Sequence, residues 1–148
     1  MAAADVGGLP ARTLERAEID SFLRSQGHGV LSLAAAGEAY GFPVSFGYDG
    51  ETLYFVFQRP REESRKEVFA NETTTASFLA YAVEGKADWT SVIATGPLRS
   101  VGAEEWPTLL AAVEANAWYP DLFSATEPMQ DFLGFALTPE SVTGLSAR

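Results

Sequence analysis

Alternating apolar and polar positions in the middle of the chain predict β-strands. Residues 39–58, AYGFPVSFGYDGETLYFVFQ, contain two alternating runs on either side of Asp49-Gly50. This dipeptide favours a two-residue type I′ turn because both of its residues tolerate a positive φ. We therefore predict a β-hairpin in which Tyr48 faces Glu51, and the pairs that follow are Phe46 with Leu53, Val44 with Phe55 and Phe42 with Phe57.

The two faces of this hairpin differ in bulk. One face carries the aromatic and branched side chains of those pairs and is predicted to lie in the core. On the first strand, the other face has no side chain larger than proline: Gly41, Pro43, Ser45 and Gly47. Glycine and proline inside a strand indicate a bend or a close approach. The face is therefore either a barrel corner or a slot for a flat ligand.

The rest of the pattern alternates helices and strands. Helices are predicted at Leu14–Ser25 with Thr13 as its cap, from about residues 62–65 onward, and at Gly102–Asn116. Strands are predicted at 29–35, 73–83, 89–101 and 132–145. Strands joined by short turns favour an antiparallel meander that closes into a barrel. We predict a single domain at 13–148 behind a flexible lead-in at 1–12.

Composition narrows the function classes. The 148 residues carry a net charge of −10 with only two lysines, which argues against binding nucleic acid or an anionic membrane surface. Without cysteine and with His28 as the single histidine, a disulfide framework, a thiolate nucleophile and a multi-histidine metal centre are excluded. The chain has no apolar run of membrane-spanning length and no secretion signal at its start, so a cytoplasmic protein is expected. Its acidic, lysine-poor surface is typical of proteins that stay soluble in concentrated salt.

Ser64-Arg65-Lys66 is an unusual cationic triplet in so acidic a chain. At a predicted helix start, the free N–H groups, Arg65 and Lys66 together suit a phosphate. The alternative is that these cations pair with Glu62, Glu63 or Glu67 on a solvated helix face. Beside the small-sided face of the hairpin, such a helix start would cradle a planar, phosphorylated ligand.

Two later stretches also carry candidate chemistry. Thr90 and Ser91 place two hydroxyl groups side by side at a strand start, where they can donate to phosphate oxygens. The loop-like stretch 118–130 is rich in apolar residues, so it covers a subunit interface, a cofactor edge or the open end of the barrel.

The order of these features resembles a known family. A hairpin with a Tyr-Asp-Gly turn, an aromatic strand, Ser-Arg-Lys at a helix start, a Thr-rich strand and Trp-Thr-Ser-Val follow one another between Gly27 and Gly102. This order resembles the FMN-binding split-barrel proteins, and more closely their small pyridoxamine 5′-phosphate oxidase-like members. The resemblance implies a mainly β fold, an antiparallel split β-barrel of about six strands with flanking helices. It also implies a homodimer with the cofactor, FMN, at the interface.

The resemblance further implies which residues bind FMN. Arg65 and Lys66 would hold the phosphate, assisted by Ser91, and their neighbours Ser64 and Thr90 complete the expected polar set. Backbone groups on the hairpin would meet the isoalloxazine ring, namely those of Pro43, Val44, Ser45, Phe46, Phe57 and Gln58. No residue is assigned as a catalytic acid or base, and no metal site is expected.

Departures from the family narrow the expected activity. Gly41 and Phe46 stand where true pyridoxamine-phosphate oxidases have basic residues, and their Trp- and Arg-containing C-terminal segment has no counterpart near 141–148. Vitamin B6 oxidation is therefore not predicted. The leading hypothesis is an FMN-dependent oxidoreductase that takes hydride from NAD(P)H and reduces a small acceptor. The alternatives are a reductase using the deazaflavin cofactor F420, or a non-catalytic module that holds flavin or haem.

Overall fold

The structure is a computed structural model that describes residues 5–6, 9–58, 65–116 and 132–147. Half of the predicted lead-in (residues 1–4 and 7–8), Ser64 and the stretch 118–130 lie outside these residues. The described helices are α1 (Arg16–Ser25), α2 (Arg65–Glu72) and α3 (Trp106–Glu114). The strands are β1 (Asp5–Val6), β2 (Leu9–Pro10), β3 (Arg12–Thr13), β4 (His28–Ala35), β5 (Glu38–Tyr48), β6 (Leu53–Gln58), β7 (Ala76–Gly85), β8 (Asp88–Gly96), β9 (Leu98–Ser100), β10 (Phe132–Leu137) and β11 (Ser141–Ala147).

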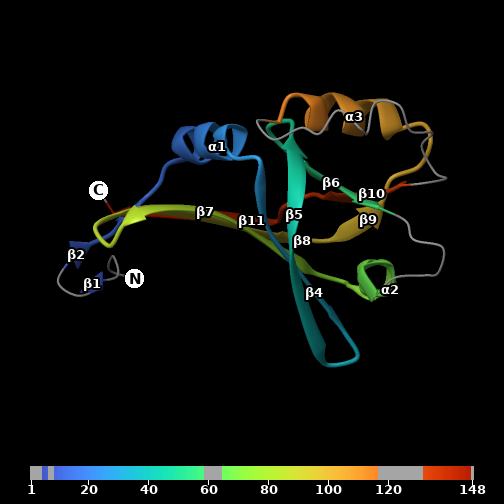
Figure 1. The fold of residues 1–148 in the computed structure, drawn as a ribbon, viewed down its shortest axis with the longest axis horizontal. Coiled ribbons are helices and arrows are strands. Elements are labelled where there is room, and N and C mark those ends of the chain that lie inside the picture. Colours follow the sequence, from blue (N-terminus) through green and yellow to red (C-terminus); the bar gives the residue numbers. More distant parts are fainter. Residues whose placement is uncertain (1–4, 7–8, 59–64, 117–131, 148) are drawn as a thin grey trace.

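Nine of these strands form one curled antiparallel sheet, in the order β3-β11-β8-β7-β4-β5-β6-β10-β9 (Figure 1). The mainly β, split-barrel prediction is confirmed, but with more strands than about six. The predicted strands 89–101 and 132–145 are each divided at a proline, Pro97 and Pro139, because proline cannot donate to the ladder. After each break the chain takes new neighbours: β8 pairs with β11, whereas β9 pairs with β10. The chain therefore passes directly from one end of the sheet to the other, from β8 to β9 and from β10 to β11. These two connections hold the ends of the sheet together and curl it.

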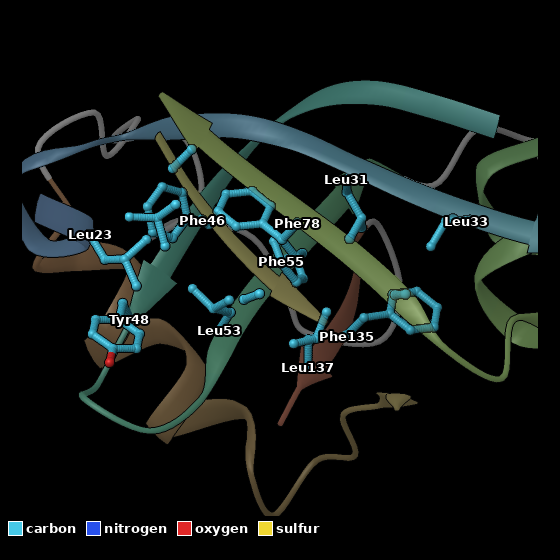
Figure 2. Close-up of a cluster of buried hydrophobic side chains, with 14 of the residues drawn as sticks. Leu23, Leu31, Leu33, Phe46, Tyr48, Leu53, Phe55, Phe78, Phe135 and Leu137 are labelled. Atoms are coloured by element: carbon cyan, nitrogen blue, oxygen red, sulfur yellow. The ribbon is translucent and has the colours of Figure 1, made fainter. Parts of the chain in front are cut away.

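Aromatic rings fill the interior of the curled sheet (Figure 2). Phe78 of β7 lies 4.7 Å from the ring centroid of Phe46 and 5.2 Å from that of Phe55. Both hairpin residues are almost fully buried, as the alternation predicted for this face. Ile19 and Leu23 of α1 are buried in the same cluster, which confirms that α1 packs one face on the sheet. A second cluster lies under α3 and includes Trp106, Leu109, Val113, Tyr54 and Ala136.

The predicted register of the central hairpin is wrong by two residues. Tyr48 pairs with Leu53 and Phe46 with Phe55, so the loop between β5 and β6 has four residues rather than two. The side chain of Asp49 explains the longer loop, because its Oδ1 accepts the backbone N–H groups of Glu51 at 2.9 Å and Thr52 at 2.7 Å. A shift of two residues leaves every side chain on its predicted face.

The two-residue turn occurs instead between β4 and β5. Ala36 and Gly37 both have positive φ, 51° and 81°, as a type I′ turn requires. This turn and the pairing of residues 28–35 with 38–45 make β4 and β5 a long arm that extends beyond the neighbouring strands (Figure 1).

Two predicted element boundaries also differ. The cap of α1 is Glu15, whose capping box is completed by Glu18, and not Thr13, which belongs to β3 and pairs with Leu145. Thr73 ends α2 rather than starting β7, because its N–H and its hydroxyl both donate to the carbonyl of Phe69, at 2.9 Å and 2.7 Å. Local hydrogen bonds of acidic and hydroxyl side chains decide both boundaries.

Candidate functional site

β5 and β6 diverge at the centre of the sheet. Residues 46–48 of β5 pair with β6, whereas residues 38–45 pair only with β4 among the described strands. The far part of β6, residues 56–58, pairs with β10 on its other side. One backbone edge of β5 therefore has no strand beside it over residues 38–45 in the described part of the chain. We call this divergence the β5–β6 split.

Aromatic side chains occupy the β5–β6 split. Phe42 lies 5.3 Å from the ring centroid of Tyr40 and 5.4 Å from that of Phe57. Tyr40 also lies 5.3 Å from Phe69 of α2, and Phe57 lies 5.0 Å from Phe135 of β10. The rings join β5, β6, β10 and α2 into one apolar unit.

Arg65 and Lys66 stand over these rings at the start of α2. The guanidinium carbon of Arg65 is 5.1 Å from the ring centroid of Tyr40 and 5.2 Å from that of Phe69. The ammonium nitrogen of Lys66 is 4.9 Å from the ring centroid of Phe42. Both cations are exposed, so each has an apolar ring on one side and solvent on the other. The result is a positively charged rim above an aromatic floor.

Arg65 forms its ion pair with a residue that the sequence pattern did not indicate. Its Nη2 lies 3.2 Å from Oε2 of Glu38, the first residue of β5. The sequence had suggested Glu62, Glu63 or Glu67 instead, of which the first two lie outside the described residues. Glu38 was missed because its approach to α2 depends on the fold of the β4–β5 arm and not on helical spacing.

The expected ring-binding residues lie along the β5–β6 split, but their side chains differ in access. Phe46 and Phe57 are buried, at 1% and 4% exposure, so only their backbone groups can meet a ligand. Val44 is half-buried on the same face. The backbone of Gln58 pairs with Phe132 at the end of β6.

The small residues on one face of β5 lie in two different environments. A Cβ atom on Gly47 would lie 2.5 Å from the backbone of Ala112, so this glycine is required by the close approach of α3. Gly41 and Pro43 are exposed and Ser45 is half-buried. Their partners on β4 are Ser32, Val30 and His28.

The predicted cradle of small-sided face and cationic helix start does not form within one chain. Arg65 and Lys66 pack against Tyr40 and Phe42, which alternate along β5 with Gly41 and Pro43. Successive side chains of a strand point to opposite faces. The cations and the small side chains therefore lie on opposite sides of β5.

Thr90 and Ser91 also lie on opposite faces, of β8. The Oγ1 of Thr90 is 3.0 Å from the Oγ of buried Ser146, on the side of the sheet where α1 packs. Ser91 is half-buried on the other side, opposite Tyr81 and Leu145. Within one chain the two hydroxyls therefore have different surroundings, and their role in phosphate binding stays a prediction.

Ser91 is also remote from α2 along the sheet. It pairs with Tyr81, five residues from the start of β7, which is about 17 Å of strand. Figure 1 shows α2 beside the start of β7 and the turn between β7 and β8 at the far end.

Ser91 borders an exposed apolar surface that sequence reasoning did not identify. Tyr81, Val83 and Ile93 are exposed by 51%, 64% and 43%. Tyr81 and Val83 also line an open cavity of about 510 Å³. Its other lining residues are Val30, Leu79, Trp89, Thr90 and Ser91. We call Val30, Leu79, Tyr81, Val83, Trp89 and Ile93 the outer apolar face. The signal in the sequence was that β7 carries apolar residues on both faces, whereas a strand with one solvated face alternates apolar and polar residues.

Among the described residues, no three His, Cys, Asp or Glu side chains are grouped so that they would hold a metal ion. None of the described helices has the length and apolar character needed to cross a membrane.

Several solved structures have folds similar to that of this chain. The FAD-binding protein of Mesorhizobium loti is 20% identical, with a TM-score of 0.75 over 93% of this chain and 99% of its own. The FAD-binding protein of Mycobacterium smegmatis is 21% identical, with a TM-score of 0.67 over 93% of this chain and 98% of its own. The FAD and haem binding protein of M. smegmatis is 15% identical, with a TM-score of 0.73 over 93% of this chain and 73% of its own.

A search among curated proteins found no match. The sequence pattern of one family matches residues 15–146, nearly the whole chain. The chain belongs to the pyridoxamine 5′-phosphate oxidase family.

Proposed function

We propose that this protein binds a flavin nucleotide, FMN, at the β5–β6 split and acts as a flavin-dependent oxidoreductase. The observation that carries the proposal is the pair of exposed cations, Arg65 and Lys66, above the aromatic rings of Tyr40, Phe42 and Phe69. A flavin nucleotide combines a planar apolar ring system with a phosphate, and this site offers both kinds of contact. The neighbours named for FAD binding support a flavin, and they make FAD the ligand to compare with FMN.

The residues present fit such a ligand. Arg65 offers a planar, two-pronged contact to phosphate oxygens and Lys66 a compact charge. Backbone groups of residues 43–45 lie on the part of β5 that has no strand along one edge among the described residues. They are able to hydrogen-bond to the polar edge of a ring system. A cationic rim, an apolar floor and unpaired backbone groups are what a flavin site requires.

We further propose that the site is completed by a second copy of the chain. Arg65 and Ser91 lie near opposite ends of β7, so one phosphate can contact both only if they come from two copies. The outer apolar face beside Ser91 supplies a surface suited to such contact. A homodimer would thus bring Ser91 of one copy towards the cations of the other.

Bound flavin would accept hydride from a nicotinamide donor and pass electrons to a small acceptor. The protein's own groups bind and orient the cofactor: the cations hold the phosphate, and the aromatic floor excludes water from one side. No described side chain is assigned as an acid or base, so proton transfer is left to solvent or substrate.

The test is flavin uptake by the purified protein. We expect FMN to bind with quenching of its fluorescence, and the double variant Arg65→Ala/Lys66→Ala to bind at least about a hundredfold more weakly, because two charge-assisted phosphate contacts are lost. Arg24→Ala is the matched control, since Arg24 also stands over a tyrosine ring, Tyr48, but on α1.

Stopped-flow reduction by NADH or NADPH then separates an enzyme from a module that holds flavin without turnover. Failure to bind FMN and FAD would refute the proposed function. Binding of F420 alone would identify a deazaflavin-dependent reductase, and a bound flavin that nicotinamides never reduce would indicate the non-catalytic module.

A further inference from the structure

Glu38 is held beside the proposed phosphate contacts by the fold of the β4–β5 arm. It follows the tight turn at Ala36-Gly37 directly, and its carboxylate lies 3.2 Å from the guanidinium of Arg65. The arm is fixed to α2 at a second point. The backbone N–H of Ala34 donates to Oγ1 of Thr73 at 3.1 Å, and this hydroxyl donates to the carbonyl of Phe69 at 2.7 Å. The arm is therefore held at both ends of α2, by Thr73 just past the end of the helix and by the Glu38–Arg65 pair at its start.

The contact occupies one donor of the residue that the proposed function assigns to phosphate. An arginine binds phosphate best when two of its N–H groups point at the same anion. Glu38 engages one N–H of Nη2 of Arg65, so a phosphate that approaches the same edge of the guanidinium must displace this carboxylate. Lys66 differs, because in the described part of the chain no carboxylate lies within ion-pair distance of its ammonium group.

The ion pair is weak enough to be exchanged. Its side chains are 60% and 67% exposed, and exposed pairs of this kind contribute little to stability. A phosphate with two negative charges competes well against one carboxylate, but Glu38 would then remain nearby as a like charge. Both effects lower the affinity for a phosphorylated ligand and leave an uncharged ligand unaffected.

We propose that Glu38 is a specificity-determining residue which competes with the ligand's phosphate for Arg65 and so limits discrimination between phosphorylated and unphosphorylated flavins. This inference rests on the proposed function. Removal of the carboxylate charge is expected to tighten binding of FMN by about three- to tenfold at low salt, given the screened interaction of charges a few ångströms apart near a surface. Binding of riboflavin, which has the same ring system and no phosphate, is expected not to change.

The experiment measures the dissociation constants of FMN and riboflavin for the wild-type protein, Glu38→Gln and Glu51→Gln. Glu51 is an exposed carboxylate in the loop between β5 and β6, at the other end of β5, so its variant makes the same change in net charge away from α2. The pair of variants Arg65→Gln and Glu38→Gln/Arg65→Gln completes a cycle. In the Arg65→Gln background the gain from Glu38→Gln is expected to fall, and in molar KCl the gain in the wild-type background is expected to shrink.

The outcomes separate this inference from the proposed function. Tighter FMN binding by Glu38→Gln, with riboflavin and Glu51→Gln unchanged, supports the inference. Equal FMN affinity in Glu38→Gln and the wild-type protein overturns it while flavin binding stands. An equal gain for riboflavin, or for Glu51→Gln, overturns it as well. If no variant binds any flavin, the proposed function fails and the inference fails with it.

Discussion

Ala36 has a left-handed backbone conformation, which costs free energy for any residue with a Cβ atom. Its φ is 51°, and the following Gly37 has a φ of 81°. We expect Ala36→Gly to raise the free energy of unfolding by about 0.5–1 kcal/mol, because the left-handed conformation strains alanine more than glycine loses in chain entropy.

Gly37→Ala should lower the free energy of unfolding by about 1 kcal/mol through backbone strain alone, since an added Cβ meets no atom within 4 Å. Urea denaturation measures both, and a stabilising Gly37→Ala would contradict the assigned turn.

Single residues also show what strand alternation can and cannot predict. Alternation placed Phe42, Phe46, Phe55 and Phe57 on the core face, and all four are buried. The same rule places Thr90 and Ser91 on opposite faces of β8. It also places the small side chains of β5 on the face opposite Arg65 and Lys66. The family motif, in contrast, assigns all of these residues to one cofactor site. A motif gives order along the chain, whereas the partners of each side chain depend on which elements pack above and below it.

At the scale of elements, Arg99 of β9 and Glu105 at the start of α3 join the helix to the sheet. Arg99 donates to both carboxylate oxygens of Glu105, and the hydroxyl of Tyr54 lies 3.4 Å from Oε2. The hydrogen bonds from Arg99 lower the pKa of Glu105 below its ordinary value of 4.5, against the opposing effect of burial. A carboxylate with a lowered pKa in the folded state contributes stability that is complete above its unfolded pKa and is lost as the pH falls through the folded value.

We therefore expect Arg99→Gln to destabilise the protein above pH 4.5 and to have a smaller effect at lower pH, where Glu105 becomes protonated in both proteins. Urea midpoints between pH 3 and pH 6 measure this difference. Lys86→Gln, which removes an exposed charge at the turn between β7 and β8, is the control and should shift the midpoints equally at every pH. A constant difference between Arg99→Gln and the wild-type protein would contradict the assignment.

The sequence predicted most elements but not all of their neighbours. Helical periods identify α1 and α3 because each buries one side against the sheet, and β-branched and aromatic residues identify β7. The breaks at Pro97 and Pro139 were missed, although proline is a recognisable signal, because the apolar pattern continues through both. The register of β5 against β6 was wrong because Asp49 caps a longer loop, and Asp-Gly alone does not reveal which side-chain hydrogen bonds form.

At the scale of the whole molecule, the outer apolar face is the feature that one chain leaves unexplained. Alternation along β7 and β8 cannot say whether apolar side chains on their second face meet another element or a second chain. The sequence led to a dimer through the family resemblance, and the apolar stretch 118–130 offered a subunit interface as one of three explanations. Because Tyr81, Val83 and Ile93 are exposed, we propose that the interface between two copies lies on this face of the sheet.

Replacing Ile93 by lysine tests that location. Ile93 lies opposite Leu79 of β7 and Thr143 of β11, so a lysine there would place a charge within the proposed interface. We expect Ile93→Lys to weaken dimerisation at least about a hundredfold, because an unpaired charge is costly to remove from water, and to weaken FMN binding with it, since Ser91 of the second copy would be withdrawn. Thr108→Lys, at an exposed position on α3, is the control and should leave both properties unchanged. Sedimentation velocity and fluorescence titration measure them. A wild-type monomer, or an Ile93→Lys dimer of normal affinity, would show that the outer apolar face does not join two copies.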